Sequence, residues 1–308
     1  MSEIFVIISL AILGAALGSF AVAQVYRIRL KQLSSTKKLT ASERTELSRL
    51  KKLHPAPQKS SSKNQKPLKS LASDRSKCLA CGYTLAPRDL IPIFSWVALR
   101  GRCRKCHAPI GATEFLTELT LAVLFPLSFL LWQTPLTLSF ATTTSTILPL
   151  AQFALWLIFL TILTVLFLYD LRWQLLPTFL LTALTILAVL FALTAYDTLF
   201  TTDALIHLAV SILLLSGTYL VLHHASQGRW VGSGDWILAL PLAILLSNWL
   251  LALLTLFLAN LIGSLAVIPS LISKKLTTNS AIPLGPLLII AFVVIFFAGP
   301  YLTRIFLP

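Results

Sequence analysis

The four cysteines of the chain form two CxxC pairs in one short segment. Cys78 and Cys81 make the first pair, Cys103 and Cys106 make the second, and 21 residues separate the pairs. This spacing is typical of two knuckles that place four thiolates tetrahedrally around a structural zinc ion. Two other interpretations stay open, namely thiols that bind no metal and a redox-active CxxC. His107, directly after Cys106, is an alternative zinc ligand.

Two aspartates, Asp170 and Asp235, stand at the ends of apolar stretches. An ionised carboxylate is costly in the middle of a bilayer, so acids at such positions are functional candidates. Two carboxylates at close range share a proton, and the pair can hold a water as nucleophile while it protonates a carbonyl oxygen. That chemistry is aspartic proteolysis. The alternative is that Asp170 pairs with Arg172 or caps a helix and that Asp235 caps the next helix.

Glycines precede the second aspartate in the sequence Gly232-Ser233-Gly234-Asp235. A residue without a Cβ atom permits the close approach of an extended peptide backbone. Gly232 and Gly234 are therefore predicted to bind substrate beside Asp235.

The composition predicts that these residues lie in a membrane protein, because it excludes a soluble globular protein. The chain is 56% hydrophobic and 12% charged, and its mean hydropathy is +0.84. A helix needs about 20 apolar residues to cross a hydrocarbon core. Eight apolar stretches, the sixth of them short, lie at 4–26, 115–134, 147–169, 175–196, 203–223, 236–248, 250–272 and 284–306. We expect an all-α integral membrane protein with about eight transmembrane helices.

Positive charge sets the expected orientation. The loop at 27–113 carries 20 of the 25 Lys and Arg residues against four acids, a net charge of +16. The positive-inside rule places this loop in the cytoplasm. Counting the spans onward puts Asp170 and Asp235 together at the cytoplasmic edge, and puts Asp197 and Asp203 on the opposite side.

Composition also divides the chain into segments. Residues 1–27 are expected to form the first transmembrane helix, 28–77 a basic and largely disordered insertion, 78–113 the zinc-binding module, and 114–308 a seven-helix membrane domain. Within the insertion, a capping box at the start of Thr40–Leu53 predicts a short surface helix. The basic residues favour contact with anionic lipid headgroups over specific nucleic-acid binding, because no aromatic residues are interleaved with them.

Several separated segments resemble the type IV prepilin peptidase family of membrane aspartic proteases. The matching segments are Gly18-Ser19-Phe20 with Tyr26-Arg27, Cys78 to Gly111, Phe115-Leu116-Thr117-Glu118-Leu119, Asp170 to Pro177, Gly232 to Asp235, and Ile282 to Pro286. They cover nearly the whole chain except residues 31–77, which look like an insertion.

The resemblance implies a GxGD-type endopeptidase that removes the basic leader from type IV prepilins or pseudopilins at the cytoplasmic face of the bacterial inner membrane. It implies that Asp170 and Asp235 are the catalytic aspartates. It also places Glu118 where the family has a glutamate in its second span, and an acid there suits a basic leader. The family often methylates the new N-terminal amine with S-adenosylmethionine.

Three positions depart from the family pattern. The family usually has a lysine where this chain has Ile237 and an aspartate where it has Thr178, and an asparagine is common in its first-span signature where this chain has Val22. The alternative function is therefore a catalytically degenerate membrane scaffold or prepilin-binding protein.

Overall fold

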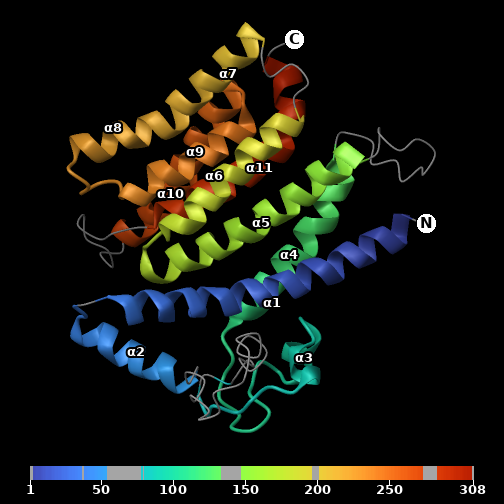
Figure 1. Cartoon of the computed structure of the whole chain (residues 1–308), viewed down its shortest axis with the longest axis vertical. Coiled ribbons are helices and arrows are strands. Elements are labelled where there is room, and N and C mark those ends of the chain that lie inside the picture. The colour runs from blue at the N-terminus through green and yellow to red at the C-terminus, as the bar shows by residue number, and fades with distance from the viewer. Residues whose placement is uncertain are drawn as a thin grey trace, which may run out of the picture. The chain divides into compact units, whose positions relative to one another are not determined.

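The computed structural model describes residues 3–36, 38–53, 78, 80–132, 147–195, 201–272 and 283–306. Every regular element in these ranges is a helix, which confirms the predicted all-α class (Figure 1). The chain forms two compact units, Met1–Leu127 and Ser128–Pro308. The predicted division into four segments stays a prediction.

The first unit contains the long helix α1 (Glu3–Ser35), α2 (Ala41–Leu53), the 3₁₀ turn η2 (Pro87–Leu90), α3 (Phe94–Ala98) and most of α4 (Ala112–Leu131). Helix α1 continues eight residues beyond the expected end of the first span at residue 27. This extension packs on α2, with Leu33 and Leu50 buried against each other. An ion pair joins Arg29 to Glu46 at 3.0 Å. Tertiary contact therefore stabilises a helical segment that composition alone does not favour.

The start of α2 confirms the predicted capping box. The backbone N–H of Glu43 donates to Thr40 Oγ1 at 3.3 Å, and the backbone N–H of Thr40 donates to Glu43 Oε2 at 2.9 Å. Two N–H groups that a helix start leaves without intrahelical partners are satisfied in this way. The rest of the predicted insertion, residues 54–77, lies outside the described residues.

The second unit is a bundle of apolar helices around α9 (Ser233–Leu246). The others are α5 (Ile147–Trp173), α6 (Thr178–Ala195), α7 (Thr202–Ile212), the π-helical turn η3 (Leu213–Gly217), α8 (Thr218–Ala225), α10 (Trp249–Ile272) and α11 (Leu284–Phe306). Helix α9 contacts α6, α7, η3, α8, α10 and α11. Most of its side chains are buried. A helix enclosed on all sides has to be apolar on every face, which its sequence is.

Six helices in the described part of the chain are long and apolar enough to cross a membrane. Two further apolar helices, Thr178–Thr194 and Ser233–Leu246, are shorter. The eight predicted stretches therefore all form helices, but a count of eight spans stays a prediction. At 1.5 Å per residue, the 14 residues of α9 extend about 21 Å, less than the hydrocarbon thickness of about 30 Å.

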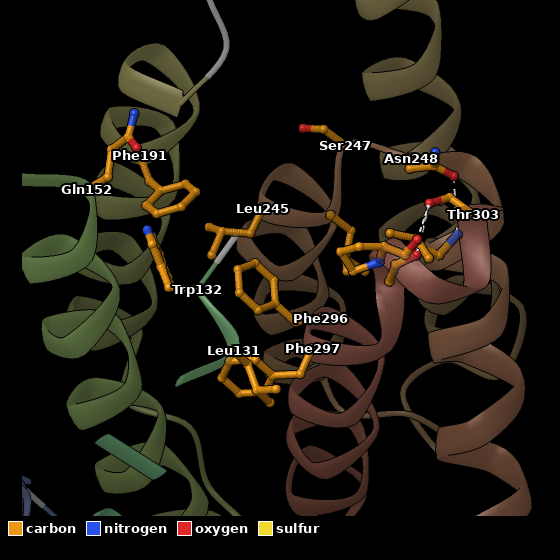
Figure 2. Close-up of a pocket in the computed structure, with 14 residues that line it drawn as sticks. Leu131, Trp132, Gln152, Phe191, Leu245, Ser247, Asn248, Phe296, Phe297 and Thr303 are labelled. Carbon is orange, nitrogen blue, oxygen red and sulfur yellow. Dashed lines mark hydrogen bonds between the residues drawn. The ribbon is translucent and has the colours of Figure 1, made fainter. Parts of the chain in front are cut away.

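A cavity of about 500 Å³ lies at the end of the second unit where α9 stops. Figure 2 shows Trp132 and Phe191 on one side of it and Leu245 and Phe296 on the other. The turn after α9, at Ser247, also lines the cavity. Because Asp235 stands at the opposite end of α9, this cavity is separate from the aspartates.

Candidate active site and metal centre

The structure brings Asp170 and Asp235 to one end of the second unit. Asp170 lies in the last turn of α5 and Asp235 in the first turn of α9. Their side chains are almost fully buried, with exposed fractions of 4% and 9%. They are also close enough for Asp170 to feel the charge of Asp235. The predicted juxtaposition of the two carboxyl groups is therefore present in the fold, although their chemical role stays a prediction.

Asp170 is held by a segment far along the chain. The backbone N–H of Gly285, in the first turn of α11, donates to Asp170 Oδ2 at 3.1 Å. A Cβ atom on Gly285 would lie 2.6 Å from the same oxygen. Only glycine lets this backbone approach the carboxyl group so closely. Gly285 is thus a hydrogen-bond partner of Asp170, and the alternative pairing of Asp170 with Arg172 stays a prediction.

Asp235 is held by its own helix start. It is the third residue of α9, and its Oδ2 accepts a hydrogen bond from the backbone N–H of Gly232 at 2.9 Å. The capping role considered for Asp235 is therefore real. It does not exclude a chemical role, because a carboxylate has two oxygens and about four lone-pair sites.

The glycines before Asp235 have close contacts within the protein. A Cβ atom on Gly234 would lie 2.8 Å from Cβ of Leu176, in the connection between α5 and α6. A Cβ atom on Gly232 would lie 3.1 Å from Asp235 Oδ2. Gly234 therefore lets the start of α9 approach the end of α5. Substrate binding by Gly232 and Gly234 stays a prediction.

The four cysteines converge in the first unit. Their Sγ atoms all lie within 4.8 Å of one another, and the Cys78 and Cys106 sulfurs are 3.9 Å apart. Thiolates around zinc at about 2.3 Å would be separated by about 3.8 Å in a tetrahedron. The cluster thus fits a four-coordinate zinc ion, held by Cys78, Cys81, Cys103 and Cys106.

The two CxxC pairs form matching knuckles. In the first, the backbone N–H of Gly82 donates to the Cys78 carbonyl at 2.9 Å, and in the second that of His107 donates to the Cys103 carbonyl at 3.0 Å. Gly82 and His107 both have positive φ angles, 71° and 55°. His107 therefore occupies the turn position that Gly82 has in the first knuckle. In the described residues it is not part of the cysteine cluster, so the alternative of His107 as a ligand is not supported.

The four cysteines would be stabilised in their thiolate form by a bound cation. A hydrogen bond from the backbone N–H of Cys106 lowers the pKa of the Cys103 thiol to about 7. The backbone N–H of Ala108 favours the thiolate of Cys106, but desolvation and the neighbouring thiols raise the pKa of this residue to about 12. A divalent cation would offset the mutual repulsion of the thiolates, since metal binding displaces their protons. With four sulfur ligands, such a zinc ion has no open position for catalysis.

We expect about one zinc ion per chain in purified protein, measured by elemental analysis. Replacing Cys103 with serine should remove the zinc, because a buried thiolate ligand is lost. His107→Asn is the matched control and should keep it, since asparagine tolerates a positive φ angle. Metal-free protein after purification under reducing conditions, or loss of zinc in His107→Asn, would contradict the four-cysteine site.

Glu118 lies in the first unit, in α4. Its Oε2 accepts a hydrogen bond from the backbone N–H of Ile93 at 2.7 Å. With Glu114 and Trp96 it lines a cavity of about 430 Å³ that extends to the cysteine module. Tyr26 donates to Glu114 Oε1 at 3.3 Å at the same cavity. Substrate binding by Glu118 stays a prediction.

The sequence did not predict two stabilising contacts around these sites. One is the hydrogen bond from the Gly285 N–H to Asp170, although Ile282 to Pro286 is one of the segments that match the family. The other is the ion pair between Arg104 and the buried Asp89, at 2.8 Å. Burial acts to raise the pKa of Asp89, but hydrogen bonds from Arg104 and Ala86 hold this pKa below its usual value. The ion pair fixes the loop before α3 to the second knuckle.

The fold and the sites define a multi-pass helical membrane protein with a four-cysteine cluster that fits a zinc ion and a buried pair of aspartates. The family model described as the bacterial Peptidase A24 N-terminal domain matches residues 12–132. A prepilin leader peptidase/N-methyltransferase of Aeromonas salmonicida (strain A449) is 30% identical over 239 residues, which are 77% of this chain and 76% of the relative. The chain therefore belongs to the prepilin leader peptidase/N-methyltransferase family.

Other relatives agree with this assignment. A protein of the same name from Pseudomonas aeruginosa is 28% identical over 240 residues, 77% of this chain and 76% of the relative. The type 4 prepilin-like proteins leader peptide-processing enzyme of Escherichia coli O78:H11 is 48% identical over 63 residues, and this match spans only 23% of that relative. No solved structure matches the chain.

Proposed function

We propose that this protein is an aspartic endopeptidase that removes the leader from type IV prepilin-like proteins. The observation that carries the proposal is the pair of buried carboxyl groups, Asp170 and Asp235, at one end of a membrane bundle. The names of the relatives support the choice of prepilins as substrates.

The chemistry follows from sharing one proton between two carboxyl groups. The ionised carboxylate takes a proton from water, and the water oxygen bonds to the scissile carbonyl carbon. The other carboxyl group gives its proton to the carbonyl oxygen. When the tetrahedral intermediate collapses, one hydroxyl group gives its proton to the ionised carboxylate and re-forms the C=O bond. The C–N bond breaks, and the amine leaves with the proton of the other carboxyl group. The backbone N–H groups of Gly285 and Gly232 would hold Asp170 and Asp235 in place for these steps.

The proposed location is the bacterial inner membrane, with the 27–113 loop and the aspartates on the cytoplasmic side. The excess of Lys and Arg in this loop supports this orientation. There the leader of a prepilin would meet the aspartates while its hydrophobic helix stands in lipid. Basic residues of the 28–77 segment would contact anionic headgroups, at about 1 kcal/mol each.

We also propose that the protein methylates the amine that cleavage exposes, with S-adenosylmethionine as methyl donor. The cavity of about 430 Å³ in the first unit supports this second activity, because small-molecule sites have volumes of about 300–1,000 Å³. Glu114 and Glu118 would face the cationic sulfonium and amine groups, and the Trp96 ring offers a stacking surface. Glu118 binds either the leader or the methyl donor in this proposal, and the following experiment distinguishes the two roles.

Co-expression with a candidate prepilin, followed by mass spectrometry of its N-terminus, tests both activities. We expect loss of the leader and a gain of one methyl group. Glu118→Gln should leave cleavage intact and remove the methyl group if the cavity binds the methyl donor, and should reduce cleavage if it binds the leader. An uncleaved prepilin that still co-purifies with the protein would favour the alternative, a prepilin-binding scaffold.

A further inference from the structure

One face of the continuous helix formed by α7, η3 and α8 lies along α9. Three polar side chains on this face form hydrogen bonds to backbone carbonyl oxygens in α9 and in the loop before it. The pairs are Ser211 with Ala243 at 2.9 Å, Ser216 with Trp236 at 2.8 Å, and His223 with Val231 at 2.8 Å. The two segments therefore run antiparallel, in register from the middle of α9 to the loop before it. The five-residue step from Ser211 to Ser216 passes through the π turn η3, which keeps both serines on the same face.

Tyr219 belongs to this face. It stands three residues after Ser216 and four before His223, so its side chain points in the same direction as theirs. The register places it beside the first turn of α9, where Asp235 precedes Trp236. The charge of Asp235 acts on the Tyr219 phenol, in agreement with this placement.

The hydroxyl group of Tyr219 is buried without a hydrogen-bond partner among the described residues. Only 2% of the residue is exposed. The side chain of Asn260, on α10, interacts with the phenol group, but no group among the described residues has the distance and angles of a regular hydrogen bond to the hydroxyl. A buried hydroxyl without a partner destabilises the folded state, because it has lost its hydrogen bonds to water. Such groups are rare in native proteins, and a catalytic role is one of their recognised explanations.

We propose that Tyr219 is a catalytic residue of the peptidase reaction, and that its phenolic O–H donates a hydrogen bond to the scissile carbonyl oxygen as the carbon becomes tetrahedral. This role rests on the function proposed above. When the water oxygen bonds to the carbonyl carbon, the π electrons of the C=O bond move to the carbonyl oxygen. The proton of the water goes to the ionised carboxylate and the proton of the other carboxyl group goes to the oxygen. Tyr219 keeps its own proton throughout.

Because the Tyr219 hydroxyl has no regular hydrogen bond to the described residues of the free protein, it can form one for the first time in the transition state. A hydrogen bond that forms only in the transition state raises kcat, whereas one that also forms in the ground state lowers KM without that gain. A donor fixed by packing needs no reorganisation when charge develops on the carbonyl oxygen. Tyr219 meets this condition because its ring is enclosed and because the helix register places it beside the first turn of α9, which carries Asp235.

The test uses the full chain in lipid nanodiscs with a purified prepilin substrate. Tyr219→Phe should lower kcat about 100-fold, in the range seen when one oxyanion donor is removed. Its KM should stay within about two-fold of the wild-type value. The thermal unfolding midpoint should be unchanged or higher, because the variant loses a hydroxyl that has no partner.

Ser211→Ala is the matched control, since it removes a buried hydroxyl from the same helix face at a point remote from the aspartates. It breaks a hydrogen bond to α9 and should lower the unfolding midpoint while kcat stays at the wild-type value. A Tyr219→Phe variant with unchanged kcat overturns the proposal. So does one whose kcat and unfolding midpoint fall together, because that pattern belongs to a structural hydrogen bond.

The same assay separates this inference from the proposed function. If the wild-type protein leaves the prepilin intact, or if Asp235→Asn still cleaves it, the peptidase function fails and the role of Tyr219 fails with it. If the wild type cleaves, Asp235→Asn does not, and Tyr219→Phe matches the wild type, only the assignment of Tyr219 is wrong.

Discussion

Asp170→Asn and Asp235→Asn are each expected to abolish leader cleavage while the protein still inserts and folds. An amide has nearly the shape of a carboxyl group but cannot take a proton from water or hold a shared one. Its oxygen still accepts a hydrogen bond, so the backbone N–H groups of Gly285 and Gly232 keep their acceptors. The measurement is the fraction of prepilin processed, by mass spectrometry, together with the amount of protein in the membrane.

Asp203→Asn is the matched control. Asp203 lies in the first turn of α7, which begins at the end of the bundle where α9 stops, remote from Asp170 and Asp235. Its replacement should leave processing unchanged. Full processing by either Asp170→Asn or Asp235→Asn would exclude the two-carboxyl mechanism, whatever the control shows.

Local spacing and counting of spans could predict much of this site. The cysteine cluster follows from two CxxC pairs, because each knuckle is a local turn that needs no distant contact. The common end of Asp170 and Asp235 follows from the direction of the helices that carry them. Both inferences depend only on local sequence and topology, and the structure brings these residues together as expected.

Contacts between distant segments could not be predicted in the same way. The Gly285 N–H reaches Asp170 across 115 residues, and neither residue type indicates the other. The sequence does not predict the extension of α1, because its stability depends on Leu33, whose partner Leu50 lies in another helix. Tyr219 looks like any interfacial aromatic residue in the sequence. Its position beside Asp235 depends on the π turn η3, which the apolar pattern does not reveal.

Gly285→Ala is expected to lower kcat for leader cleavage about 100-fold with little loss of stability. The new Cβ atom would lie 2.6 Å from Asp170 Oδ2, which is the end of a side chain and can move away. That movement relieves the clash but breaks the hydrogen bond from the Gly285 N–H and displaces the carboxyl group. A displacement of about 1 Å at a reacting group can cost about 100-fold in rate. Steady-state cleavage and thermal unfolding of the purified variant measure the two effects.

Gly299→Ala provides the control within the same helix, α11. Its Cβ atom would also press on the end of a flexible side chain, at 3.0 Å from Cδ1 of Leu251, but beside the cavity at the other end of the bundle. Both variants therefore require the end of a neighbouring side chain to move, but only in Gly285→Ala is that side chain Asp170. We expect cleavage by Gly299→Ala to equal that of the wild type. Equal activity in the two variants would show that the Gly285 N–H does not position Asp170 for catalysis.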